Sequence, residues 1–449
     1  MTGTPPPGDI RPFTITHRTV LSISIPMMLA YLSTPLVGII NTGVVGQLGS
    51  AALIGGVAVA SVIFEIVLSS FNFLRAGTTG LTAQAIGAGD ALEELAVLAR
   101  ACVVALILGL LIVLLQYPIG QLGYAVFGVT GEVATAAADY FDVRVWSAPV
   151  LLFNYAILGW MLGRGDAVAS MMLQTLLNGI NAGLAIWFVL GLDWGVAGAA
   201  WAALIAETVT LLAGLAFVAR RLKPRKRPDR AQIFDMRQFR RAMSMNADML
   251  VRSLALLIGI SFFTHQSAAL GTDMLAANTI LLRIYMFTTA WLDGIATAAE
   301  QLAGRAAGAR FRPAFDRTVT LTTKWGLGTA VCLAAFLYLA GPALIGAMTT
   351  VEEVRTLANT YLIWAAVLPL AGVIAFQMDG IFIGATWSRD MRNMMVLSLI
   401  VYVVAWALLM PRFGNHGLWA AFLIFHGARS IVFSYRLKGL ARSTFPPLS

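Results

Sequence analysis

The chain has 449 residues, of which 59% are hydrophobic and only 12% are charged. A soluble domain carries roughly twice that charged fraction, so this composition lacks the polar surface that water requires and favours a lipid environment. The two cysteines, Cys102 and Cys332, lie in apolar runs, and the sequence has only four histidines. These counts exclude a disulfide framework and a clustered metal site, and we expect no cofactor.

Twelve apolar stretches, taken in chain order, approach or exceed the roughly 20 residues that a membrane-spanning helix needs. The first begins near Val20 and is longer than the core of a signal peptide, so we expect it to be retained as a helix. The sequence predicts an all-α integral membrane protein. Its spans are expected at 20–46, 51–76, 95–116, 142–163, 166–190, 194–219, 242–266, 272–300, 318–340, 358–384, 392–410 and 414–436.

The longest polar break, 220–241, is rich in arginine and lysine and contains two prolines, which predicts a linker between two halves. We expect an N-terminal six-helix lobe over 1–219 and a C-terminal one over 242–449. Connections on the side of the linker are also basic, whereas those on the other side hold acids such as Glu132 and Glu353. The positive-inside rule then places the linker and both termini in the cytoplasm of a multi-pass protein of the cell membrane, the inner membrane in a bacterium. Topology therefore explains the net charge of +9 without a nucleic-acid partner.

The two halves repeat each other at an offset near 220 residues. The segment 48–53 recurs as 270–275, and Gly-Trp-Met-Leu-Gly at 159–163 recurs as Gly-Ile-Phe-Ile-Gly at 380–384. Each match is weak alone, but the shared offset and order indicate two pseudo-symmetric six-helix lobes. With six spans in each half, both lobes have the same orientation, and a cavity is expected between them.

The most specific stretch of the sequence is Phe73-Leu-Arg-Ala-Gly-Thr-Thr-Gly-Leu-Thr-Ala-Gln-Ala-Ile-Gly87, at the end of the second span. Together with Leu275-Ala-Ala-Asn278 and Asp379-Gly-Ile-Phe-Ile-Gly-Ala385, it resembles the multidrug and toxic compound extrusion (MATE) transporters, and among them the DinF-type branch. The resemblance covers nearly the whole chain. It implies two six-helix lobes, alternating access, and export of amphipathic or cationic small molecules driven by inward flow of H⁺ or Na⁺. We also expect a monomer in the lipid bilayer.

One position departs from the family pattern in a way that bears on proton coupling. The family pattern implies an acid before Thr42, but this chain has Asn41, whose amide does not titrate. A second acid often seen late in the fifth span is Ala185 here. The usual proton site of the first lobe therefore does not carry over directly.

The second span offers another candidate for coupling. Ser61, Glu65, Ser69, Asn72 and Thr79 follow helical spacing and are expected to share one face, directed to the interior of the lobe. Burial of Glu65 would disfavour its charged form and favour proton uptake. A structural hydrogen-bonding role for Glu65 is the alternative.

The second lobe carries a similar stripe in the eighth span, where Asp293 and Glu300 lie seven residues apart. With Asp379 in the tenth span, these acids are expected to approach one another inside the lobe and to form a proton or cation site. The alternative is that they pair with Arg252 and Arg283, the two arginines predicted to lie in the membrane.

Other polar residues in the spans have simpler interpretations. Asp248 and Arg252 lie four residues apart, which predicts an ion pair within one helix. Glu207 lacks an obvious partner on its own helix and is a weaker coupling candidate. Asn178 and Asn181 are predicted to form hydrogen bonds between helices.

We weigh three classes of function against this pattern. A cation-coupled exporter, with H⁺ favoured over Na⁺, fits best. A flippase for a lipid-linked substrate is the alternative, but its cavity would carry several arginines, and only Arg252 and Arg283 are predicted to be buried. An enzyme is not expected, because the sequence offers no nucleophile–base pair and the Gly77–Gly80 stretch has no preceding strand, as a nucleotide motif requires.

Overall fold

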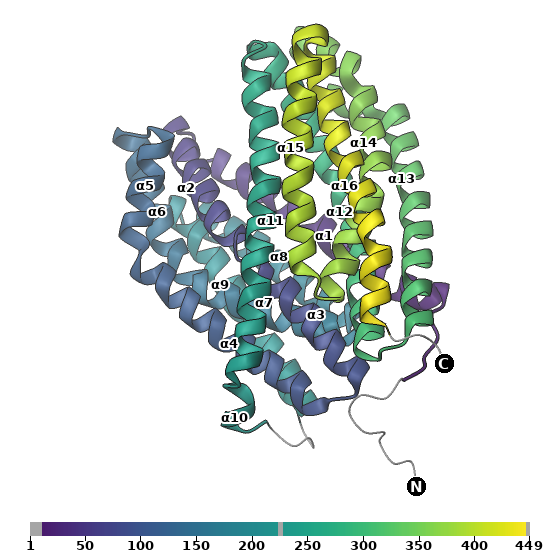
Figure 1. The fold of residues 1–449 in the computed structure, drawn as a ribbon. Coiled ribbons are helices and arrows are strands. Elements are labelled where there is room, and N and C mark those ends of the chain that lie inside the picture. Colours follow the sequence, from purple (N-terminus) through teal and green to yellow (C-terminus); the bar gives the residue numbers. More distant parts are fainter. Residues whose placement is uncertain (1–10, 223–227, 446–449) are drawn as a thin grey trace. The chain divides into compact units, whose positions relative to one another are not determined.

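The computed structural model describes residues 11–222 and 228–445, which form helices joined by short connections, with no strand among them (Figure 1). Within these residues, twelve segments are long and apolar enough to cross a membrane. They follow the twelve predicted spans in order, so the predicted all-α membrane fold is confirmed. Residues 223–227 of the predicted basic linker lie outside the described residues.

Tertiary contacts divide the chain into two compact units. The N-terminal unit comprises Leu29–Ala85 and Asp90–Ala242, and the C-terminal unit comprises Met1–Met28, Ile86–Gly89 and Met243–Ser449. The C-terminal unit thus takes in the first part of helix α1 (His17–Gly46) and the end of α3 (Phe73–Ala88). The sequence repeat by itself assigns both of these segments to the other half.

The N-terminal unit contains eight further helices and two short irregular turns. The helices are α2 (Ala51–Ser69), α4 (Ala91–Leu114), α5 (Gln116–Phe127), α6 (Gly131–Arg144), α7 (Ala148–Arg164), α8 (Ala167–Ile186), α9 (Gly195–Leu222) and α10 (Arg230–Ile233). A 3₁₀ turn, Val145–Ser147, joins α6 to α7, and a π-helical turn, Trp187–Gly191, ends α8.

The second predicted span is broken in two, because α2 ends at Ser69 and α3 begins at Phe73. The residues of the break are of the kinds that compete for backbone hydrogen bonds. The Ser70 hydroxyl donates to the Ile66 carbonyl at 2.9 Å, and Asn72 accepts a hydrogen bond from Arg75 at 3.2 Å. Helical spacing counted across residues 70–72 therefore does not hold.

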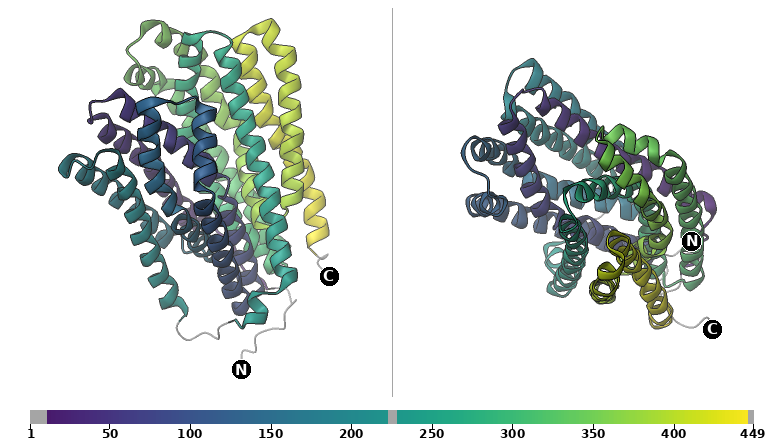
Figure 2. Two further views of the ribbon diagram at one scale, coloured as in Figure 1. Left: turned by 90° about the vertical axis from the view of Figure 1, so that its left-hand side faces the viewer. Right: turned by 90° about the horizontal axis from the view of Figure 1, so that it is seen from above.

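The C-terminal unit is a bundle of six long helices that are seen end-on in the right panel of Figure 2. They are α11 (Met236–Ala268), α12 (Thr272–Gly308), α13 (Arg312–Met348), α14 (Glu352–Gly384), α15 (Ser388–Phe413) and α16 (Asn415–Thr444). The bundle surrounds an aromatic core that includes Phe263, Tyr402, Trp419 and Phe422. Beside this core, buried Asn278 accepts a hydrogen bond from the indole of Trp419 at 2.9 Å.

The same glycine-mediated helix crossing occurs in both units. A Cβ atom on Gly159 of α7 would collide with the backbone carbonyl of Arg75 on α3. A Cβ atom on Gly380 of α14 would collide in the same way with the carbonyl of Ala296 on α12. Gly380 lies 221 residues after Gly159 in the sequence, and Ala296 lies 221 residues after Arg75. The internal repeat seen in the sequence is therefore a repeat of packing, in which glycine allows two backbones to touch.

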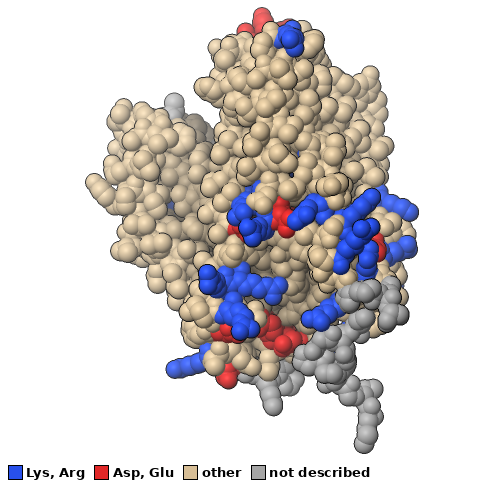
Figure 3. Space-filling model, in the orientation of Figure 1, with Lys and Arg blue, Asp and Glu red and all other residues tan. Residues whose placement is uncertain are grey.

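Charged side chains gather towards one end of the C-terminal unit, and much of the remaining face in Figure 3 is uncharged. Basic residues lie at the junction of α12 and α13, at the start of α15 and at the end of α16. They are Arg305, Arg310, Arg312, Arg317, Arg389, Arg392, Arg436, Lys438 and Arg442. The opposite end carries the acidic start of α14, Glu352 and Glu353. The charge asymmetry expected from the sequence is thus a property of the folded bundle.

Candidate functional site

The N-terminal unit holds a buried ion pair between α6 and α9. Both guanidinium Nη atoms of Arg144 donate to the carboxylate of Glu207, at 3.0 and 2.6 Å. The guanidinium also lies over the ring of Phe64 of α2, 4.2 Å from its centroid. Glu207 is only 4% exposed, and Asn154 of α7 donates to its backbone carbonyl. The partner that Glu207 lacks on its own helix is Arg144, at the end of α6.

Glu65 lies near this pair but is not buried. Its side chain is exposed on α2, and so is Asn72 in the break after α2. The predicted burial of Glu65 and Asn72 is therefore wrong, whereas Thr79, which lies beyond the turn on α3, is buried. The hydroxyl of Tyr155 on α7 lies within electrostatic range of Glu65, Arg75 and the Arg144–Glu207 pair. Charges carried by four helices therefore lie near one phenol.

Asn41 and Asn178 both lie in the N-terminal unit, and the structure gives them different environments. Asn178 of α8 donates to the hydroxyl of Ser33 on α1 at 2.6 Å, so its predicted hydrogen bond between helices is confirmed. The side-chain oxygens of Asn41 and Asn181 are buried without a hydrogen-bond partner among the described residues. Because a buried carbonyl without a donor is unfavourable, Asn41 is a polar position with unused hydrogen-bonding capacity.

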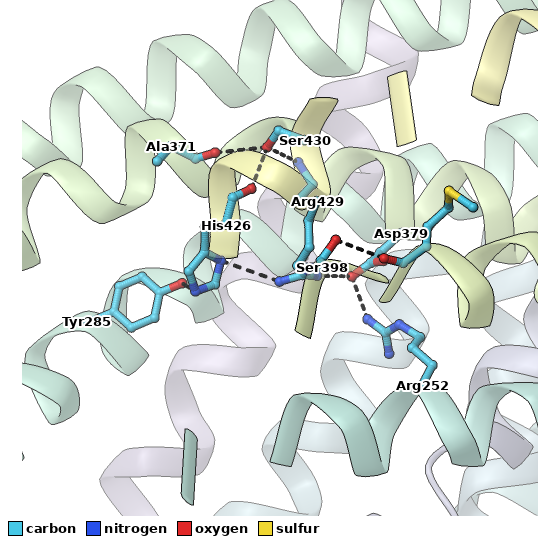
Figure 4. Close-up of polar contacts among 10 residues, drawn as sticks. Arg252, Tyr285, Ala371, Asp379, Ser398, His426, Arg429 and Ser430 are labelled. Carbon is cyan, nitrogen blue, oxygen red and sulfur yellow. Dashed lines mark hydrogen bonds and ion pairs between the residues drawn. The ribbon is translucent and has the colours of Figure 1, made fainter. Parts of the chain in front are cut away.

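The C-terminal unit holds a second buried charge cluster, centred on Asp379 of α14 (Figure 4). Arg252 of α11 and Arg429 of α16 both donate to Oδ2 of Asp379, at 2.5 and 2.7 Å. Asp379 is 5% exposed and Arg429 is fully buried. The cluster therefore joins three helices through two guanidinium groups and one carboxylate.

The cluster continues from Arg429 to α12 through a histidine. An Nη atom of Arg429 lies 3.4 Å from Nδ1 of His426, and Nε2 of His426 lies 3.2 Å from the hydroxyl of Tyr285. All of these side chains are buried. Figure 4 shows this polar path running from α12 through α16 to α14 and α11.

The three acids predicted to meet in this unit are placed differently. Glu300 and Asp379 are buried, whereas Asp293 is exposed. The three do not form one metal-binding group, and no group of three or more His, Cys, Asp or Glu side chains that could hold a metal occurs in the described part of the chain. Of the two arginines offered as alternative partners, Arg252 does pair with Asp379, while Arg283 is exposed.

The predicted intrahelical pair of Asp248 and Arg252 is also replaced by contacts between helices. Asp248 accepts from Arg392 at 2.6 Å and from Ser388 at 3.0 Å, both at the start of α15. Arg252 turns instead towards Asp379. Side chains four residues apart on one helix can pair, but partners on neighbouring helices are closer here.

Sequence reasoning missed Arg144, Tyr155, His426 and Arg429 as members of these clusters. A signal existed for Arg429, because an arginine inside the twelfth predicted span is costly in lipid and usually has a partner. Tyr155 carried no such signal, since tyrosine is common in membrane helices.

Comparison with known proteins gives a consistent family assignment. The family model described as MatE matches residues 26–187 and 248–408. The chain is 36% identical to DNA damage-inducible protein F of Escherichia coli over 419 residues, which cover 93% of this chain and 91% of that protein. It is 28% identical over 304 residues to the probable multidrug resistance protein NorM of Caulobacter vibrioides, covering 65% and 63% of the two chains.

A solved structure has the same fold. It is described as the outward-facing conformation of a multidrug resistance MATE family transporter of the MOP superfamily. The two structures superpose with a TM-score of 0.88 at 21% identity, over 95% of this chain and 96% of that one. The family model, the relative at 36% identity and the helical architecture agree. The chain therefore belongs to the MATE family of membrane transporters and is a transporter, not an enzyme.

Proposed function

We propose that this transporter exports amphipathic or cationic small molecules by alternating access, in exchange for inward flow of a cation, with H⁺ favoured over Na⁺. The name of the Caulobacter vibrioides relative, a probable multidrug resistance protein, supports the substrate class. The observation that carries the proposal is Glu65, an exposed acid in an otherwise apolar helix of a transporter, where a charge is costly and usually has a function. A flippase for a lipid-linked substrate is not favoured, since these relatives do not support it.

Glu65 is the group that we propose for proton coupling. Glu207 and Asp379 are already held in ion pairs with arginines, and a coupling role for either acid would require its pair to break. No ion pair or hydrogen bond of Glu65 is found among the described residues, and its side chain is exposed. Glu65 lies within electrostatic range of the Tyr155 hydroxyl, and so do Arg144 and Glu207. A proton on Glu65 could therefore alter the charge balance where α2, α6, α7 and α9 meet.

The remaining candidates have supporting roles in this proposal. Asn41 and Asn72 supply neutral polar groups, and Asp293 and Glu300 supply the acids of α12. We further propose that the basic ends of the helices, the linker and both termini lie in the cytoplasm, in line with the positive-inside rule. The transporter would act as a monomer in the cell membrane, with two lobes separated by the linker at 220–241.

Gradient-driven transport in proteoliposomes tests the proposal. Uptake of a cationic dye is measured with an imposed proton gradient in one arm and an imposed sodium gradient in the other. We expect the proton gradient to drive uptake and Glu65→Gln to abolish it, while the variant still binds the dye and melts like the wild type. Glu352→Gln, which changes an exposed acid at the start of α14, is the matched control. No gradient-driven uptake by the wild type in either arm would contradict the proposed function.

A further inference from the structure

The buried cluster of the C-terminal unit contains more positive than negative charge. Two guanidinium groups, Arg252 and Arg429, share one carboxylate oxygen of Asp379. We propose that Arg252 binds an anionic group of the transported molecule, a carboxylate or a phosphate, and so selects amphipathic substrates that carry an acid. This inference rests on the proposed export function and adds a substrate class to it.

The cluster of Arg252, Arg429 and Asp379 holds two positive charges and one negative charge. One carboxylate neutralises one guanidinium, and a second cation left in an apolar interior is unfavourable unless another anion compensates it. Asp248 is not available for this, because it is bound by Arg392 and Ser388. In the described part of the chain, Asp379 is the only acid that forms an ion pair with Arg252.

Burial distinguishes the two arginines. The Arg429 side chain is 0% exposed, whereas that of Arg252 is 17% exposed. Arg429 is enclosed between Asp379 and His426, so it remains with Asp379 whatever else binds. Arg252 reaches the surface of the unit and can exchange Asp379 for an incoming anion.

Arg252 also has hydrogen-bonding capacity to spare. A guanidinium has five N–H donors, and the contact with Asp379 uses one Nη atom. Its Nε atom is buried without a hydrogen-bond partner among the described residues. A carboxylate or phosphate that displaces Asp379 could bind the two Nη atoms side by side, an arrangement that the planar guanidinium allows.

The other charged groups near the cluster are consistent with this role. Arg283 of α12 is exposed and adds a positive charge to the unit. Asp293 of α12 lies within electrostatic range of Tyr285. Glu300 is buried with contacts of its own. Of the two arginines of the cluster, only Arg252 has an exposed part of its side chain, so it is the one that an anion can reach.

The test uses three fluorescent probes that share one alkyl chain and differ in the head group, a carboxylate, an alcohol or a trimethylammonium. Binding to the purified full-length protein is measured by fluorescence anisotropy. We expect the carboxylate probe to bind at least about tenfold more tightly than the alcohol probe, a factor typical of one charged hydrogen-bonded contact. Arg252→Gln should abolish the difference, and the exposed control Arg283→Gln should retain it.

A folding check, one further variant and two competing anions make the result decisive. Asp379 keeps Arg429 as a partner in Arg252→Gln, so this variant should fold, which its melting temperature checks. Arg252→Lys, which keeps the charge but loses the planar fork, should retain part of the preference. The inference is overturned if Arg252→Gln binds the carboxylate probe like the wild type. It is also overturned if chloride or inorganic phosphate binds at Arg252 while the carboxylate probe does not.

Failure of this inference and failure of the proposed function give different results. If Arg252→Gln loses the carboxylate preference but still exports the cationic dye in a gradient, both are supported. Gradient-driven dye export together with no carboxylate preference contradicts the anion site alone. Intact carboxylate preference without any gradient-driven export contradicts the proposed coupling alone.

Discussion

The guanidinium of Arg144 and the carboxylate of Glu207 bind side by side, with two hydrogen bonds of 3.0 and 2.6 Å, although 63 residues separate them in the sequence. Both side chains are largely buried. This pair holds the end of α6 against the middle of α9. Each charge compensates the other, which would be unfavourable if it were buried alone.

Removing one partner of this pair is expected to be more harmful than removing both. Arg144→Met or Glu207→Leu alone should lower the free energy of unfolding by about 3–5 kcal/mol, because the other charge stays buried without a partner. The double variant should recover most of that loss. Melting temperatures of the purified protein in detergent measure the effect.

The exposed pair of Glu352 and Arg355 is the control for that experiment. Its atoms are 3.4 Å apart, but the Glu352 side chain is 77% exposed. Exposed ion pairs contribute little, so Glu352→Gln should leave the melting temperature nearly unchanged. Equal melting temperatures for the single and double variants of Arg144 and Glu207 would contradict the prediction.

The glycine crossings are expected to be equally sensitive in the two units. Gly159→Ala and Gly380→Ala should each destabilise the protein by about 1–3 kcal/mol or more, because the added methyl meets a backbone carbonyl that cannot move aside. Gly179→Ala is the control, since nothing lies within 4 Å of a Cβ there and alanine favours a helix. Thermal unfolding compares the three, and tolerance of both crossing variants would refute the shared packing.

Asn41→Asp is expected to make stability depend on pH. A carboxylate at this position would be buried where the Asn41 oxygen has no hydrogen-bond partner among the described residues, so the neutral acid is favoured in the folded state. The folded variant then holds a proton that the unfolded chain releases, and its stability relative to the wild type falls as pH rises.

Melting temperatures of Asn41→Asp at about pH 5 and about pH 8, on either side of the usual range for a shifted carboxyl, measure this slope. Asn359→Asp serves as the control, because Asn359 is exposed. A melting temperature that differs from the wild type by the same amount at both pH values would be inconsistent with burial of the new acid.

The partner of Asp248 is testable by double-mutant cycles. Asp248→Asn and Arg392→Gln should show an interaction energy of about 0.5–3 kcal/mol, since the two side chains are in direct contact. The same cycle with Arg252→Gln should show almost none. Strong coupling of Asp248 to Arg252 would instead restore the pairing within α11 that the sequence spacing suggests.

The sequence alone determined that this protein lies in lipid, that it has twelve membrane spans and that its two halves are similar. In lipid, the backbone N–H and C=O groups of an apolar stretch of about 20 residues can all form hydrogen bonds only if the stretch is a helix. The composition therefore leaves little choice of fold class. The repeat of Gly159 as Gly380 at a constant offset could be read directly, because both positions serve the same helix crossing.

The tertiary structure decided which charges meet. Glu207 finds Arg144, and Asp379 finds Arg252 and Arg429, through contacts between helices far apart in the sequence. Glu65 is exposed rather than buried, and the spacing along α2 alone could not show which face of that helix packs against its neighbours. Periodicity defines the faces of a single helix, but the rotation and tilt that bring two faces together are set by packing of the whole bundle.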